Sequence, residues 1–203
     1  MPISEDFPLQ TLNPYGRSKL MVEDILRDLY HSDPRWRIVL LRYFNPVGAH
    51  TSGLIGEDPA GPPNNLMPFV AQVVSGQQKE LLVFGDDYPT KDGTGVRDYI
   101  HVQDLAEGHL AALQYLERER GLVAVNLGTG RGYSVFEMIE AFEKVASKKV
   151  PYKVVARRPG DIAVCYADPT LAKKLFYWEA KLDIDRMCQD AWRWQQHSAN
   201  AKA

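Results

Sequence analysis

Tyr15 and Lys19 lie four residues apart, and this pair has the clearest chemical potential in the sequence. Pro14 suits the first position of a helix, and Asn13 before it suits the N-cap. In a helix that begins there, Tyr15 and Lys19 share one face. An ammonium beside a phenol favours the phenolate, so we expect the pKa of Tyr15 to fall below its usual value of about 10. Such a phenol can take a proton from an alcohol and return it.

The same spacing is common in ordinary amphipathic helices, where the tyrosine and the lysine are simply exposed. The apolar residues that follow give this helix a broad hydrophobic side typical of such an element. They are Leu20, Val22, Ile25, Leu26 and Leu29. The pair alone therefore does not establish a catalytic site, and the rest of the chain must decide between the two interpretations.

Further polar residues fall at predicted strand ends and in loops, where open α/β sheets bind ligands. Asn45 follows a buried strand, and Asn64 and Asn65 open a helix, a position that suits an anion. Arg97 and Arg158 are suited to bidentate recognition of phosphate, and Asp161 could hold hydroxyls of a ribose or another sugar. Each arginine could instead form a surface ion pair. His101 and His109 are expected to be packed or solvated rather than catalytic.

The chain alternates helices and strands, which predicts an α/β fold. The run 37–44 is almost continuously apolar, as in a strand buried on both faces of a parallel sheet. We expect one long loop at 45–63. Further helices are predicted at about 14–31, 66–74, 104–118, 135–146, from 168–169 and from 183, and further strands at 81–84, 96–101, 122–127 and 152–155.

One glycine-rich stretch, residues 128–132, imitates a dinucleotide-binding turn. Its spacing is GxGxG rather than GxGxxG, and lysines stand about 20 positions on, where an acidic residue is needed. We interpret it as a turn between a strand and a helix. The sequence therefore contains no pyrophosphate cradle for a nicotinamide cofactor.

Composition excludes several classes of partner. The formal net charge of the 203 residues is −2, which argues against nucleic acid or an anionic membrane. No apolar run reaches the length of a bilayer span, and the acidic first residues do not resemble a signal peptide. Cys165 and Cys188 match no metal or redox spacing, and so few cysteines favour a cytoplasmic location.

Six segments in fixed order resemble the UDP-glucose 4-epimerase family of extended short-chain dehydrogenase/reductases. They are Asn13-Pro14-Tyr15-Gly16-x-Ser18-Lys19, Leu41-Arg42-Tyr43-Phe44-Asn45-Pro46-x-Gly48-Ala49-His50, Gly56-Glu57-Asp58-Pro59, Asn64-Asn65-Leu66-Met67-Pro68, the run from Asp92 to Val102, and Asn126-Leu127-Gly128-Thr129-Gly130. The resemblance covers about residues 10–196 and is far more specific than the Tyr15–Lys19 spacing.

The resemblance implies a reaction. Tyr15 would take the proton of the sugar 4-hydroxyl while hydride passes from C4 to NAD. The 4-keto sugar would then turn over, and hydride and proton would return on the other face. Lys19 would hold the nicotinamide ribose and lower the pKa of Tyr15, and Phe44 matches a position that contacts the nicotinamide.

The resemblance also assigns residues around the UDP-hexose, with Arg97 and Arg158 at the diphosphate. These are Tyr43, Asn45, Asn64, Asn65, Leu66, Leu82, Val83, Phe84, Arg97, Arg158, Asp161 and Cys165. Cys165 falls where some members carry a bulky tyrosine. We therefore expect room for an N-acetyl group, so that UDP-GlcNAc and UDP-GalNAc would also be interconverted.

The chain departs from the family in lacking its N-terminal half, with the glycine-rich NAD turn and most strands of the Rossmann sheet. We expect residues 1–45 to be the remnant of the NAD-binding domain. Residues 46–203 would form the smaller UDP-sugar-binding α/β region, with some segments returning to the Rossmann-type parallel sheet. The separate chain should then have little or no epimerase activity.

Three functions remain open at this point. The chain could be an epimerase by descent, or a non-catalytic UDP-sugar-binding fragment or subunit that pairs with a separate NAD-binding chain. It could also be a nucleotide-sugar dehydratase, but the acidic pair expected near such a site is not found beside Tyr15. Family members form homodimers through the helix that bears Tyr15, so a homodimer of the full-length protein is expected.

Overall fold

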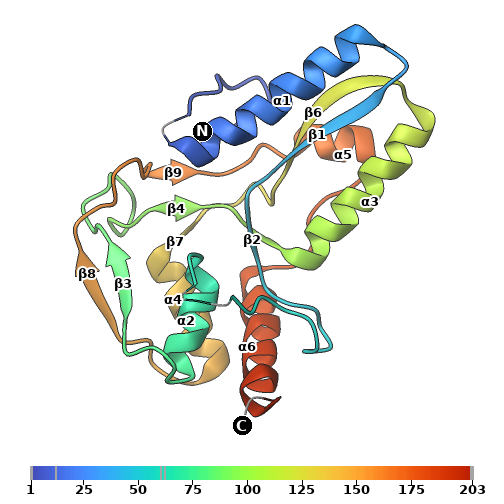
Figure 1. Ribbon diagram of the computed structural model, residues 1–203. Helices are drawn as coiled ribbons and strands as arrows, with labels where there is room; N and C mark the ends of the chain where they lie inside the picture. The colour runs from blue at the N-terminus through green and yellow to red at the C-terminus, as the bar shows by residue number, and fades with distance from the viewer. Residues whose placement is uncertain (1, 12, 60, 62, 202–203) are drawn as a thin grey trace.

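In a computed structural model, two α/β units meet along a central seam of very short strands (Figure 1). The structure describes residues 2–11, 13–59, 61 and 63–201. The helices are α1 (Pro14–Ser32), α2 (Leu66–Val74), α3 (Val102–Arg118), α4 (Val135–Ala146), α5 (Thr170–Phe176) and α6 (Ile184–Ala201). The strands are β1 (Arg37–Tyr43), β2 (Asn45–Val47), β3 (Leu81–Phe84), β4 (Val96–Arg97), β5 (Tyr99–His101), β6 (Gly121–Leu127), β7 (Tyr133–Ser134), β8 (Tyr152–Val155) and β9 (Val164–Cys165).

The first unit is a parallel pair of strands between helices, as the sequence predicts. β1 pairs with β6 over its whole length, from Arg37 opposite Gly121 to Tyr43 opposite Leu127. α1 covers one face of this pair, and α3 and α5 cover the other (Figure 1). Val125 and Leu127 are fully buried beneath α3 and α5. This arrangement confirms the predicted α/β fold with a Rossmann-type parallel sheet.

The predicted burial of β1 is only partly confirmed. Ile38 and Leu40 are buried on the face under α1, whereas Val39 and Leu41 on the α3 side are half-buried. Side chains of a strand alternate between its two faces. The difference in burial between the two faces therefore reflects how completely the helices on each side cover β1. Among the described residues, β6 is the only strand that pairs with β1.

The second unit has its own core. β3 and β8 pair in parallel, and α2, α4 and α6 pack together beside them. Phe142, Met138, Met187 and Val70 are almost completely excluded from solvent at the centre of this core. The predicted capping box opens α4: Ser134 Oγ accepts from Glu137 N at 3.0 Å, and Ser134 N donates to the Glu137 carboxylate at 2.8 Å.

Two predictions about the central strands are wrong. The expected loop 45–63, of which residues 60 and 62 lie outside the described part, begins with β2, which pairs with β5 in parallel. The expected strand 96–101 is two strands, because the chain changes sheets at Asp98. β4 before Asp98 pairs with β7 and β9, and β5 after it pairs with β2. β7 and β9 contain two residues each, too few for a periodic pattern.

A buried polar cluster ties α6 to the seam. Asp190 is fully buried and accepts from Arg186 Nε at 2.6 Å and from Arg193 Nη1 at 2.7 Å. Its Oδ2 also lies 3.3 Å from His101 Nε2. Gly48, with φ +84°, packs so closely on the His101 ring that an added Cβ would lie 3.0 Å from Nε2. The residue type at position 48 is thus restricted by both its backbone conformation and this contact.

His101 is held in its neutral form by this geometry. Its Nδ1 accepts a hydrogen bond from Gln103 N at 3.0 Å, which caps α3, so the ring proton sits on Nε2 and faces Asp190. Protonation of Nδ1 would break the cap. Burial lowers the pKa of His101, which the hydrogen bond to Asp190 only partly opposes.

No helix among the described residues is both long enough and apolar enough to cross a bilayer.

The pKa of His101 predicts a pH dependence of stability. Because the pKa in the folded state lies below the unfolded value of about 6.5, the unfolded chain binds more protons below that pH. The free energy of unfolding should therefore decrease as pH falls from about 7 toward 5. Urea titrations across this range measure the slope. His101→Gln should flatten it, whereas His197→Gln at the exposed end of α6 should not. Equal slopes in all three proteins would refute this account.

Candidate active site

The predicted acid–base pair lies on one face at the start of α1. Asn13 caps the helix by accepting from Gly16 N at 2.8 Å, and Pro14 occupies its first turn, as predicted. The Lys19 ammonium lies 5.2 Å from the centroid of the Tyr15 ring. Tyr15 is 72% exposed, so its hydroxyl is open to a ligand. The contact shows that the two side chains lie together, but both residues are exposed, so the geometry of α1 alone does not exclude the alternative of an ordinary surface pair.

A salt bridge sets the position of this pair relative to β1. Glu23 lies one turn after Lys19 and forms a bidentate bridge with Arg42, at 2.8 Å to Nε and 2.7 Å to Nη2. Arg42 Nη1 also donates to the carbonyl of Glu5 at 2.7 Å. α1 and β1 run in opposite directions, so the rise of a helix places Tyr15 about 12 Å beyond Glu23, past the carboxyl end of β1. The bridge also lowers the pKa of Glu23.

The predicted residues at the end of β1 lie at this same edge. Tyr43 is 50% exposed, with its ring 6.0 Å from that of His109. Phe44 is half-buried and donates its N–H to Leu127 O at 3.2 Å. Asn45 is exposed and donates its N–H to Asp98 O at 3.0 Å. The carboxyl end of the parallel pair therefore presents an aromatic and an amide side chain, as in ligand-binding α/β sheets.

Asp98 joins this edge to the second unit. Its buried carboxylate accepts from Thr129 N at 3.0 Å, Thr129 Oγ1 at 2.7 Å, Gly130 N at 3.0 Å and Ala167 N at 3.1 Å. The amides of Thr129 and Gly130 belong to the glycine-rich turn 128–132, so a carboxylate of the chain itself occupies the imitation dinucleotide cradle. That this turn is not a cofactor site stays a prediction, and the engagement of its amides by Asp98 is consistent with it. Burial raises the pKa of Asp98, and the four donors oppose that shift.

Arg97 and Cys165 lie side by side on paired strands. They are register partners in the parallel pairing of β4 with β9. Both are half-buried, and Arg97 Nη1 donates to Val96 O at 2.9 Å. Burial raises the pKa of the Cys165 thiol, and the charge of Arg97 partly offsets that increase. A guanidinium and a small thiol therefore share one surface.

The segments that carry Phe84 and Arg158 contact each other through these two side chains. The Arg158 guanidinium lies 4.6 Å from the Phe84 ring centroid, and its Nε donates to Asp161 at 3.0 Å. This contact is the surface ion pair that was the alternative to phosphate binding for each arginine. It engages only one edge of the Arg158 guanidinium. Leu82 is 40% exposed. Val83 is 1% exposed in the core, so its predicted place beside the substrate stays a prediction for its main chain alone.

The predicted residues at α2 form a third group. Asn64 and Asn65 are exposed, and Leu66 is half-buried at the first position of the helix. Asn65 makes no side-chain capping bond to α2. Its Nδ2 donates instead to Glu57 at 3.2 Å, which ties it to the loop after β2. Among the described residues, this group and the Tyr15–Lys19 pair make no hydrogen bond or ion pair to the Arg97 or Arg158 groups.

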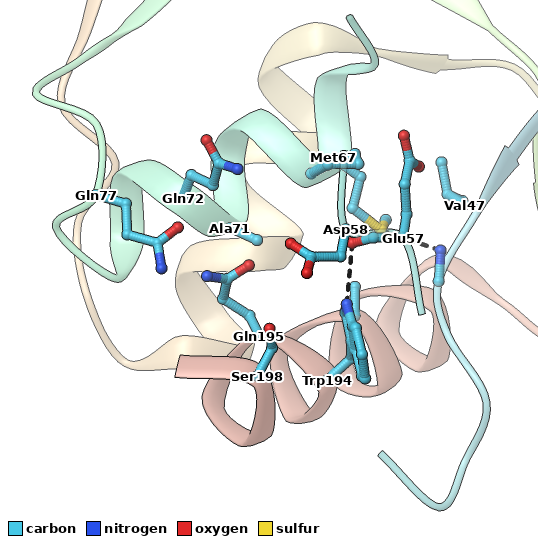
Figure 2. Close-up of a pocket in the computed structure, with 13 residues that line it drawn as sticks. Val47, Glu57, Asp58, Met67, Ala71, Gln72, Gln77, Trp194, Gln195 and Ser198 are labelled. Carbon is cyan, nitrogen blue, oxygen red and sulfur yellow. Dashed lines mark hydrogen bonds between the residues drawn. The ribbon is translucent and has the colours of Figure 1, made fainter. Parts of the chain in front are cut away.

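A small pocket lies elsewhere, between α2, α6 and the segment after β2 (Figure 2). Its volume is about 40 Å³, the size of a water site, and Asp58, Gln72, Gln195 and Ser198 give it a polar lining. Trp194 Nε1 closes one side by donating to Glu57 O at 3.0 Å. A larger cleft of about 480 Å³ lies between the glycine-rich turn and α5. Neither contains a predicted site residue.

The sequence reasoning missed Asp98 as a residue of the site. One signal was available: aspartate is disfavoured inside strands, and Asp98 stands in the middle of the predicted strand 96–101. Arg157, next to Arg158 in the chain, is engaged within the protein. Arg157 stacks 4.0 Å from the Tyr88 ring centroid and binds Asp87 at 2.6 Å. These contacts of Arg157, together with its hydrogen bond to the Asp87 carbonyl, hold a loop of the protein.

Comparison with known proteins gives a consistent result. The family model described as GDP-mannose 4,6 dehydratase matches residues 1–191. A UDP-glucose 4-epimerase of Bacillus subtilis is 63% identical over 199 residues, which are 98% of this chain and 59% of that protein. A human UDP-glucose 4-epimerase is 58% identical, over 98% of this chain and 57% of that protein. The chain thus spans somewhat less than 60% of the length of these relatives.

Solved structures agree in fold. A UDP-glucose 4-epimerase from Stenotrophomonas maltophilia, with bound NAD and formylated UDP-arabinopyranose, superposes with a TM-score of 0.96 at 53% identity. One from Bifidobacterium longum, in complex with NAD and UDP, gives a TM-score of 0.95 at 57% identity. Each match covers 98% of this chain and 60% of the solved chain.

Loss of the Glu23–Arg42 bridge should destabilise the fold. Glu23→Gln removes the charge of a bidentate pair whose side chains are both 18% exposed, and it leaves Arg42 without a carboxylate. The free energy of unfolding should fall by roughly 1–3 kcal/mol, measured by urea titration at pH 7. The control Asp24→Asn alters the neighbouring exposed carboxylate of α1 and should change stability little. An equal loss in both variants would contradict the assigned role of the bridge.

Proposed function

The chain belongs to the family that the GDP-mannose 4,6 dehydratase model describes and is similar to UDP-glucose 4-epimerases, and from this premise we propose that it supplies the acid–base pair and the sugar-nucleotide site of such an epimerase. The proposed reaction interconverts UDP-glucose and UDP-galactose. Cys165 extends it to UDP-GlcNAc and UDP-GalNAc.

One observation carries the proposal. The Tyr15 hydroxyl and the Lys19 ammonium share a face of α1, beyond the carboxyl end of β1, where Phe44 and Asn45 follow the strand. A proton carrier at that edge of a parallel sheet stands where α/β enzymes bind nucleotide ligands. The first turn of α1 contains no acidic residue, which disfavours the dehydratase alternative.

The proposed site for the sugar nucleotide extends from this edge into the second unit. Arg97 and Arg158 supply two guanidinium groups for the diphosphate, and Asp161 can accept from hydroxyls of the ligand. Tyr43, Asn45, Asn64, Asn65 and Leu66 border the sugar and uridine on the other sides. Leu82 and Phe84 add apolar surface from the end of β3, and Val83 can take part only through its main chain.

The chain fits one end of NAD. Lys19 and Tyr15 present a cation and a hydroxyl suited to the nicotinamide ribose, and Phe44 offers an aromatic surface at the end of β1. The glycine-rich turn offers no site for the pyrophosphate of NAD, because its amides already donate hydrogen bonds to the Asp98 carboxylate. When bound, NAD supplies the reversible acceptor for hydride from C4 of the sugar.

The residues of this chain handle the proton and the geometry. The Tyr15 phenolate accepts the proton of the 4-hydroxyl, and the Lys19 charge stabilises the anionic form of the phenol. The arginines hold the diphosphate while the 4-keto sugar turns, so that both faces of C4 can be presented in succession. Tyr15 then returns the proton to the new 4-hydroxyl.

A second candidate is a non-catalytic UDP-sugar-binding fragment or subunit. The high exposure of Tyr15 and the occupied glycine-rich turn favour it for the separate chain, because hydride transfer needs a bound dinucleotide. A separate NAD-binding half would convert this chain into a catalyst. Met21, Val22 and Ile25 are 49%, 52% and 64% exposed on α1, which supports α1 as the surface of a proposed homodimer.

Epimerisation assays distinguish the two candidates. The chain with NAD alone should show little or no conversion of UDP-galactose, whereas the chain joined to the N-terminal half of the Bacillus subtilis relative should be active. In the joined protein Tyr15→Phe should lower turnover by about 100-fold or more, because the proton carrier is lost. Tyr30→Phe, at the other end of α1, is the matched control. Full turnover by Tyr15→Phe would refute the assignment, and normal turnover by the chain alone would refute the second candidate.

Cys165 provides a separate test of the substrate range. In the joined protein Cys165→Tyr should fill the space for the N-acetyl group and reduce kcat/KM for UDP-GlcNAc relative to UDP-glucose by about 10-fold. Cys165→Ser keeps the size of the side chain and should leave the ratio unchanged. If Cys165→Tyr leaves the ratio unaltered, Cys165 does not determine this specificity.

A further inference from the structure

Asp98 stands at the point where four segments of the proposed site come together. Asp98 is the single residue between β4 and β5, and Arg97, the last residue of β4, directly precedes it. Its N–H donates to Cys165 O at 3.0 Å, and its carbonyl accepts from Asn45 N at 3.0 Å. The main chain of one residue therefore connects the strand ends that carry Arg97, Cys165 and Asn45.

The side chain of Asp98 fixes this junction to a fourth segment. Oδ1 accepts from Thr129 N and Thr129 Oγ1, and Oδ2 accepts from Gly130 N and Ala167 N. Packing around the carboxylate leaves no spare room: a Cβ at Gly128 would lie 2.7 Å from Oδ2 and 2.5 Å from Ala167 Cβ. The carboxylate is fully buried, and all its hydrogen-bond partners are donors. It has no access to a substrate and acts only through what it holds.

Both oxygens must be acceptors for this arrangement to exist. An asparagine amide has one oxygen and one NH₂ group. In one orientation its NH₂ would face the N–H groups of Gly130 and Ala167, and in the other it would face Thr129 N, with only the Thr129 hydroxyl able to turn and accept. A buried donor without an acceptor is strongly unfavourable, so the four segments would have to move apart to admit water. Position 98 therefore requires a carboxylate because both oxygens accept hydrogen bonds from the protein, and not because the charge faces a ligand.

We infer that Asp98 is a positioning residue of the proposed epimerase site, which sets the placement of Arg97 and Cys165 relative to Asn45 by holding their strand ends against the glycine-rich turn. The glycine-rich turn then has a role of its own. Its amides, which in a dinucleotide fold would bind pyrophosphate, here bind the carboxylate that aligns the sugar-nucleotide site. The effect on ligand binding rests on the proposed function, whereas the effect on the strand ends does not.

The strand ends can be tested without any ligand, through Cys165. In Asp98→Asn the loss of two acceptor contacts should loosen β9 from β4 and expose the thiol, so its alkylation by iodoacetamide should accelerate by roughly 10-fold. Cys188 is fully buried in the other core and serves as an internal reference. The control Asp168→Asn alters a nearby carboxylate that binds Thr170, and its rate should match the parent chain. Parent-like alkylation of Asp98→Asn would overturn the inference.

The second measurement is calorimetric titration of the full chain with UDP and with uridine. Because Asp98 acts through Arg97, Asp98→Asn should weaken UDP binding by roughly 10-fold and leave uridine binding within about twofold. A general loss of folded protein would lower both in proportion. In a double-mutant cycle Arg97→Gln should show little further loss on the Asp98→Asn background. Additive losses, or equal losses for UDP and uridine, would overturn the role assigned to Asp98.

Two further outcomes are separable. If the parent chain binds no UDP, the proposed function fails, while the alkylation rates still decide whether Asp98 holds the strand ends. If Asp98→Asn does not fold, Thr129→Val removes one donor to Oδ1 and leaves the others in place. It should shift the Cys165 rate in the same direction by a smaller factor, and an unchanged rate in that variant would count against the inference.

Discussion

A buried carboxylate surrounded by main-chain amides joins the two halves of this protein. At Asp98 the chain leaves the sheet of β4, β7 and β9 and enters the sheet of β2 and β5. A strand can change sheets only if the polar groups freed at the change find partners, because unpaired buried groups are strongly unfavourable. Asp98 meets that condition with its side chain toward the glycine-rich turn and its main chain toward Asn45 and Cys165.

The sequence predicted the regular elements well, because each has a local signal. The helix at Tyr15 has its cap and proline, the helix after Ser134 has a capping box, and β1 is a continuous apolar run. It could not predict that 96–101 is two strands, or that β7 and β9 exist. Those depend on contacts between residues far apart in the chain, such as Ala167 with Asp98, which leave no periodic pattern. The burial of Val83 was likewise a property of the core and not of the motif that contains it.

The candidate site likewise contains residues that the sequence could predict and residues that it could not. Residue types with one chemical purpose, the Tyr15–Lys19 pair and the arginines, were recognisable from the sequence. Their placement relies on residues with no such purpose: Glu23 and Arg42 hold α1 to β1, and the Asp190 cluster ties α6 to β5 and the segment after β2. The acid–base pair belongs to the first unit, Arg97 lies on β4 of the seam, and Arg158 follows β8 of the second unit. Alignment of the two units is therefore as important to the proposed reaction as the chemistry of Tyr15.

A crystal structure of the chain with UDP tests the central claim most directly. The account predicts the diphosphate between the Arg97 and Arg158 guanidinium groups, with its free terminal oxygen directed toward the face of α1 that carries Tyr15 and Lys19. UDP bound in the cleft between the glycine-rich turn and α5, or with its diphosphate away from both arginines, would contradict the assignment of a sugar-nucleotide site to these segments.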